Sequence, residues 1–176
     1  VALSMFIAKW LFGGLGSYAL NPVLIGLVMA QISWPSMLNK WPSPYPVTMG
    51  AGPKMPVETP LELLKRYGVE MAEQVPLGDM LIGLQAGGIG TVAGLALIAG
   101  GVYLIARGVI SWHIPVAYIA GIIIFGGIFR AMDPATYACP FFHLTSGMTL
   151  MGVFFLAPEH TTSPNSLWGK LLYGLG

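Results

Sequence analysis

Residues 143–158 read His-Leu-Thr-Ser-Gly-Met-Thr-Leu-Met-Gly-Val-Phe-Phe-Leu-Ala-Pro, a run that is apolar enough to cross a lipid bilayer. Its small or hydroxylated side chains include Thr145, Ser146, Thr149 and Gly152. Their spacing places them on one face of a continuous helix. On a membrane helix such a face normally meets another helix or a ligand rather than lipid. The run therefore predicts a transmembrane helix with a polar face that packs or lines a buried cofactor.

The composition of the whole chain is that of a membrane protein. Of its 176 residues, 55% are hydrophobic and 9% are charged, and the mean hydropathy is +0.73. A soluble domain carries roughly 25% charged residues. The net charge is +1 with no basic run, which excludes a nucleic-acid partner because phosphate binding needs a concentrated positive patch. We therefore expect the lipid bilayer to surround most of the surface.

The apolar runs predict an all-α, polytopic transmembrane protein with about five to six spans and one polar extramembrane loop. We divide the chain into transmembrane helices over 1–38, the extramembrane loop over 39–88, and transmembrane helices over 89–176. The expected spans cover residues 2–12 (the tail of one span), 21–38, 89–106, 114–129, 142–157, and the beginning of another over 167–176. Residues 2–12 are too few to cross a bilayer, so we expect the sequence to be the middle of a longer protein.

The loop concentrates the acidic residues, with five of the seven carboxylates of the chain. They are Glu58, Glu62, Glu70, Glu73 and Asp79. The same loop contains Thr59-Pro60-Leu61-Glu62, which is typical of a capping box at the start of a short helix over about 60–73. In it, Thr59 is the N-cap and Glu62 reaches back to the backbone N–H of Thr59.

The expected spans offer few polar groups. The four complete spans hold no Asp, Glu, Lys or Arg, which argues against a carboxylate relay within them. Cys139 is the single cysteine, so it forms no internal disulfide and no thiolate cluster, and we expect no metal site. Asn21-Pro22 follows a glycine-rich stretch and predicts a helix start. Such a start inside a membrane either holds a polar group of a ligand or simply caps the helix.

These motifs together resemble one family, the RnfD and NqrB membrane subunits of the Rnf complex and of the Na+-translocating NADH:quinone reductase. Ser146-Gly147-Met148-Thr149 is close to the Ser-Gly-Ala-Thr of that family, with Met148 in place of Ala. The polar turn over 159–164 ends in Thr-Ser-Pro as in the family, with Glu159-His160 where an Asp-centred turn is usual. The run from Ser111 to Val116 looks closer to the Rnf branch.

The resemblance implies two flavins. In the family, FMN is joined through its phosphate to the threonine of a loop motif that ends in Ala-Thr-Pro-Leu, which makes Thr59 the expected covalent FMN site. Glu58 stands where the family has Ala, and Pro56-Val57 replace a hydroxylated and a small residue. Thr149 is the competing attachment site, which we reject because a transferase would not reach it within a span. The second, non-covalent flavin is riboflavin, with Asn21 as its expected contact.

The implied function is that of a flavin-carrying membrane subunit in an ion-translocating ferredoxin:NAD oxidoreductase complex. No nucleotide fingerprint or iron–sulfur cysteine set is present, so the other membrane and peripheral subunits would oxidise NADH or ferredoxin. The chain would then be a subunit rather than a stand-alone enzyme. Counting positive charges does not decide the topology, but the resemblance places the protein in the plasma membrane with the flavin loop outside the cytoplasm. Two alternatives stay open: a flavin-free transporter or channel, and a scaffold subunit that has lost its flavin.

Overall fold

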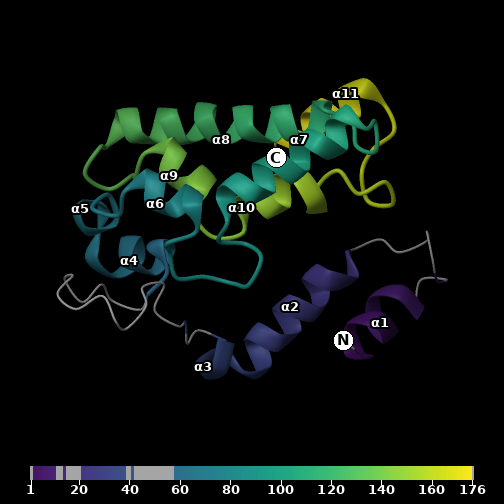
Figure 1. Cartoon of the computed structure of the whole chain (residues 1–176), viewed down its shortest axis with the longest axis horizontal. Helices are drawn as coiled ribbons and strands as arrows, with labels where there is room; N and C mark the ends of the chain where they lie inside the picture. Colours follow the sequence, from purple (N-terminus) through teal and green to yellow (C-terminus); the bar gives the residue numbers. More distant parts are fainter. Residues whose placement is uncertain (1, 11–13, 15–20, 39–40, 42–57, 176) are drawn as a thin grey trace.

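The computed structural model describes residues 2–10, 14, 21–38, 41 and 58–175, and within these ranges every regular element is helical (Figure 1). The N-terminal elements are α1 (Ala2–Met5), the π-helical turn η1 (Phe6–Trp10), α2 (Pro22–Ser33) and α3 (Pro35–Leu38). The loop elements are α4 (Pro60–Tyr67), α5 (Val69–Ala72) and α6 (Leu77–Ile82). The C-terminal elements are α7 (Gly94–Ala106), α8 (His113–Met132), α9 (Pro140–Thr145), α10 (Thr149–Met151), the π-helical turn η2 (Gly152–Leu156) and α11 (Leu167–Leu175).

Helix α8 corresponds to the span expected over 114–129 and is longer than expected. Its 20 residues have a mean hydropathy of 1.9 over their most apolar window, and within the described ranges it is the one helix long and apolar enough to cross a membrane. Helices α2 and α7 are apolar but have only 12 and 13 residues. The expectation of helical structure is confirmed, whereas the number of spans stays a prediction.

Two expected spans are shorter than the sequence suggested, and each has a local cause. The span over 21–38 is interrupted at Trp34, because the proline that follows it disfavours helical geometry at the preceding residue. The span over 89–106 begins only at Gly94. Gly90 has φ +83°, a left-handed conformation that ends any helix running into it.

The expected helix over 142–157 is wrong as a single element. It is divided into α9, α10 and η2, because Ser146 is extended (φ −87°, ψ 148°) and Gly147 is left-handed (φ +64°). The left-handed region costs glycine little and other residues more, so Gly147 permits the break. The common hydroxyl face predicted for Thr145, Ser146, Thr149 and Gly152 therefore does not exist.

Residues 58–88 form a packed helical unit on the end of α8 and α9 (Figure 1). The helix expected over 60–73 is split by Gly68 (φ +82°) into α4 and α5, and α6 was not expected. The unit shares a hydrophobic core with the start of α9, and this core is made of Leu63, Val69, Ala72, Val75, Met80, Ala138 and Phe142. Burial of these side chains holds the Thr59 end of the loop against the C-terminal helices.

Helix α11 packs closely against the first half of α8. A Cβ atom added to Gly174 would lie 2.6 Å from the Cβ of Ala117, and one added to Gly121 would lie 3.0 Å from the carbonyl oxygen of Leu175. Small residues at both positions let the two backbones approach, as in membrane helix pairs. This packing places α11 beside Tyr118 of α8, where the cavity described below is found.

Candidate functional site

Thr59 lies at the N-cap of α4 and forms the capping box that the sequence predicts. Its Oγ1 accepts a hydrogen bond from the backbone N of Glu62 at 3.3 Å, and its backbone N donates to Glu62 Oε2 at 3.0 Å. The Thr59 hydroxyl also donates to Glu62 Oε2 at 3.1 Å. The side chain is half-buried, so the structure confirms the capping role, whereas the attachment of FMN stays a prediction.

One ion pair lies beside Thr59. Arg66 Nη1, near the other end of α4, lies 2.6 Å from Glu58 Oε1. The arginine therefore offsets the charge of Glu58, the residue that replaces the usual Ala of the family motif. The other carboxylate oxygen of Glu58 is buried without a hydrogen-bond partner among the described residues. Lys54, Pro56 and Val57 lie outside the described residues.

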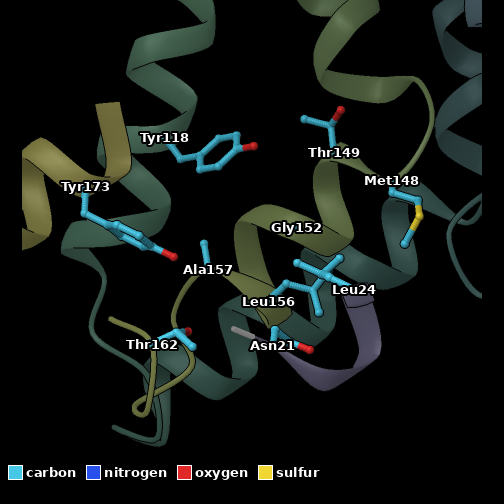
Figure 2. A pocket seen from close by; sticks show the side chains of 10 residues that line it. All are labelled: Asn21, Leu24, Tyr118, Met148, Thr149, Gly152, Leu156, Ala157, Thr162 and Tyr173. Carbon is cyan, nitrogen blue, oxygen red and sulfur yellow. The ribbon is translucent and has the colours of Figure 1, made fainter. Parts of the chain in front are cut away.

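A cavity of about 580 Å³ lies on the other side of the helix break, between α2, α8, α10, η2 and α11 (Figure 2). Its described lining residues are Asn21, Leu24, Tyr118, Met148, Thr149, Gly152, Leu156, Ala157, Thr162 and Tyr173. None of these side chains carries a formal charge at neutral pH. The lining therefore combines an apolar wall with hydroxyl and amide groups that can orient a neutral ligand.

Asn21 performs two tasks at this cavity. Its Oδ1 accepts a hydrogen bond from the backbone N of Val23 at 2.9 Å, which caps α2. Its Nδ2 donates to Glu159 Oε2 at 2.6 Å, which ties the start of α2 to the turn that follows η2. The capping interpretation of Asn21 is thus confirmed, and its contact with riboflavin stays a prediction. The glycine-rich stretch before it lies outside the described residues apart from Gly14.

Thr149 lines the same cavity, although it lies far from Asn21 in the sequence. Its hydroxyl donates to the carbonyl oxygen of Ser146 at 3.1 Å across the break. Thr59 is not among the described lining residues, so the two expected flavin positions are separate places in the structure.

Sequence reasoning missed the two tyrosines of the cavity, Tyr118 and Tyr173. Each is an amphipathic ring within an apolar helix, where a tyrosine hydroxyl needs a polar partner or ligand; Tyr118 is half-buried and Tyr173 is exposed. That need was the available signal, but it does not say that two tyrosines from different helices meet at one cavity. Among the described residues, no group of three or more His, Cys, Asp or Glu is arranged to hold a metal ion.

Comparisons with known proteins agree with the resemblance seen in the sequence. Residues 1–176 match the NQR2, RnfD, RnfE family. The D subunit of the ion-translocating oxidoreductase complex of Alcanivorax borkumensis is 32% identical over 99% of this chain and 55% of that protein. The D subunit of the Na(+)-translocating ferredoxin:NAD(+) oxidoreductase complex of Acetobacterium woodii is 35% identical over 97% of this chain and 50% of that protein. The chain spans about half the length of these curated relatives, and it belongs to the NQR2, RnfD, RnfE family.

Proposed function

We propose that this chain is part of the flavin-carrying membrane subunit of an ion-translocating ferredoxin:NAD oxidoreductase complex. The proposal is supported by family membership and by the relatives, which are named as D subunits of such complexes. The family match is the observation that carries the proposal. Its partners would be the other membrane and peripheral subunits, which bind NAD and ferredoxin.

A position in the membrane is supported by α8 and by its surface. Exposed apolar side chains occupy its middle and C-terminal parts, including Ile123, Ile124, Phe125, Ile128 and Phe129. Exposing these apolar side chains to water would cost free energy, whereas contact with lipid would not. We place the α4–α6 unit outside the hydrocarbon, because it holds most of the acidic residues of the chain. The family resemblance favours the side of the membrane that faces away from the cytoplasm.

Thr59 is proposed as the attachment site of FMN through a phosphoester on Oγ1. A phosphate at this N-cap would face the first backbone N–H groups of α4, an eight-residue helix whose N-terminal dipole favours anions. The hydroxyl is also outside the apolar spans, where a transferase can reach it. Esterification would replace the hydrogen bond from the Thr59 hydroxyl to Glu62, and the carboxylate would then oppose the phosphate.

The Asn21 cavity is proposed as the site of the second, non-covalent flavin. Its described lining has no cation to pair with a phosphate, which favours riboflavin over FMN. Asn21, Thr149 and the two tyrosine hydroxyls would orient the polar edge of the ring, and the leucine and methionine side chains would pack against its apolar part. A bound flavin supplies one-electron and two-electron transfer, and the protein contributes its position and surroundings.

A flavin-free transporter or channel is the second candidate, and one observation favours it. The helix break over 146–148 falls within a segment that is otherwise apolar enough to span a membrane. Non-helical backbone at membrane depth is tolerated where it is buried or lines a cavity, and transporters use it to bind ions and solutes. A scaffold without flavin is the third candidate, and the absence of flavin would favour both of these.

Flavin fluorescence of the denatured full-length protein on a gel tests the proposal. The protein is produced in membranes together with a flavin transferase, and the wild type is compared with Thr59→Ala and Thr149→Ala. We expect a fluorescent band for the wild type and for Thr149→Ala, and a dark band for Thr59→Ala. A dark wild-type band would contradict covalent flavin, and a band lost only with Thr149→Ala would move the site to the helix break.

A further inference from the structure

Helix α2 forms one wall of the Asn21 cavity, yet it packs mainly against its own N-terminal neighbours. Its N-cap Asn21 and its Leu24 line the cavity (Figure 2). No residue of α2 is buried, and its main packing neighbours are α1, η1 and α3. A Cβ atom added to Gly26 would lie 2.8 Å from the Cβ of Ser4, so α1 and α2 are closely packed. Figure 1 accordingly shows α1, α2 and α3 as a group apart from the C-terminal helices.

The opposite wall belongs to a separately packed group of helices. Its cavity residues come from α8, α10, η2 and α11 and from the segments beside them. The core behind this wall contains the buried side chains of Leu150, Val153 and Phe154, which residues of α7 and α8 cover. Among the residues that the structure describes, α2 contributes no side chain to this core. The cavity therefore lies between two groups of helices that are packed independently of each other.

One hydrogen bond joins the two groups at the edge of the cavity. The Nδ2 of Asn21 donates to Glu159 Oε2 at 2.6 Å, a short bond to a charged acceptor, which is the stronger kind. Glu159 lies in the turn between Ala157 and Thr162, both of which line the cavity. In a bilayer, apolar helices gain little by covering one another, so their association depends on close packing and polar contacts. Because α2 has no buried residue, this bond is important for holding it in place.

We propose that α1 and α2 together form a lid on the Asn21 cavity, and that the hydrogen bond between Asn21 and Glu159 keeps this lid closed. When the bond breaks, Leu24 moves away from the opposite wall and the cavity opens on that side. The uncharged lining would then admit a neutral, amphipathic molecule. The lid would act in the same way on any such molecule, so the inference goes beyond the flavin proposed for this cavity.

The test uses a variant that breaks the bond without removing the helix cap. Asn21→Asp keeps the N-cap of α2, because aspartate caps a helix as well as asparagine does. Its carboxylate would face that of Glu159, and we expect the lid to open. The double variant Asn21→Asp, Glu159→Gln restores one donor and one acceptor with the direction of the bond reversed, and it should close the lid again. Gln31→Glu is the matched control, since it places the same charge on an exposed position of α2.

The position of the lid is measured as the distance between two spin labels by pulsed electron paramagnetic resonance. The labels are attached to Val28→Cys of α2 and Leu172→Cys of α11, both of which are exposed positions. The full-length protein is studied in lipid nanodiscs with its native cysteines replaced by serine. We expect one narrow distribution in the protein with Asn21 and Glu159 intact, in Gln31→Glu and in the double variant. Asn21→Asp should shift the distribution to longer distances.

A second pair of variants keeps the inference testable if Asn21→Asp fails to fold. Glu159→Ala removes the acceptor and should lengthen the distance, whereas Glu159→Gln keeps an acceptor oxygen and should leave the distance unchanged. Unchanged distances in both Asn21→Asp and Glu159→Ala would overturn the inference. An equal shift in Gln31→Glu, or a double variant that stays open, would also overturn it, because the movement would then not depend on this bond.

Discussion

Glu73, at the end of α5, accepts a hydrogen bond from the guanidinium of Arg130 in the last turn of α8. The same carboxylate oxygen accepts from the backbone N of Cys139 at 3.2 Å, at the start of α9. One side chain thus joins the helical unit that bears Thr59 to the ends of two other helices. The hydrogen bond from Arg130 holds the pKa of Glu73 below its ordinary value of 4.5.

The lowered pKa of Glu73 predicts how stability depends on pH. A depressed carboxyl pKa contributes stability that is fully present above the ordinary value and is lost as the pH falls through the lowered value. We therefore expect Glu73→Gln to lower the Tm at neutral pH and to reduce the loss of Tm below pH 4.5. Glu70→Gln on the same short helix, where the side chain is exposed, is the matched control. Equal acid sensitivity in the wild type and Glu73→Gln would contradict this role.

Gln85 is predicted to be important for stability because its amide donates to the carbonyl oxygens of Met80, Val92 and Thr145, of which Val92 also accepts from the backbone N of Gly94. Gln85→Met has a similar shape and no donor, so the carbonyl oxygens of Met80 and Thr145 lose this partner. Loss of such a partner costs about 1–3 kcal/mol, and we expect the free energy of unfolding to fall by that amount. Unfolding in mixed micelles measures it, with Gln31→Met on the exposed side of α2 as the control. Equal stability of the two variants would show that Gln85 does not hold the break.

Thr59 has a structural role that can be separated from flavin attachment. Thr59→Ala removes the N-cap of α4 and should lower the free energy of unfolding of flavin-free protein by about 0.5–2 kcal/mol. Asparagine is as good an N-cap as threonine or better, but it has no hydroxyl. Thr59→Asn should therefore keep the stability of the flavin-free protein and still give a dark band on the gel. A fluorescent band in Thr59→Asn would place the flavin on another residue.

Glu62 is predicted to limit flavin attachment at Thr59. Its carboxylate lies within hydrogen-bond distance of the hydroxyl that would carry the phosphate, at 3.1 Å. Glutamine also completes a capping box but has no charge. We expect Glu62→Gln to increase the fraction of protein that carries covalent flavin, measured as fluorescence per amount of protein on the gel. A lower fraction would instead indicate that the carboxylate assists the reaction.

The sequence predicted those features of the fold that depend on neighbouring residues. The capping box at Thr59, the N-cap at Asn21 and the long helix α8 each depend on residues within a few positions of one another. The break at Gly147 could not be predicted in this way. Glycine is common within membrane helices, and the break here is surrounded by residues far away in the sequence: Leu61 lies near Gly147, and Gln85 donates to the carbonyl oxygen of Thr145.

In the candidate site, too, the sequence predicted individual residues but not how distant helices bring them together. The sequence identified Asn21 and Thr149 as separate polar positions, but the cavity that they share depends on how α2, α10 and α11 pack. Tyr118 and Tyr173 enter the site for the same reason. Thr59 was identified by resemblance to a family motif, and neither its geometry nor its surroundings would by themselves distinguish an attachment site from an ordinary helix cap.

The most direct measurement is the partition of flavin after acid precipitation of the purified full-length complex. We expect flavin in two fractions: FMN that stays with the precipitated chain at Thr59, and riboflavin released into the supernatant from the Asn21 cavity. Protein without flavin in either fraction would show that the subunit carries no flavin. Release of all the flavin as FMN would contradict both proposed sites. FMN esterified to Thr59 would precipitate with the protein, and the described lining of the Asn21 cavity has no cation to bind the phosphate of free FMN.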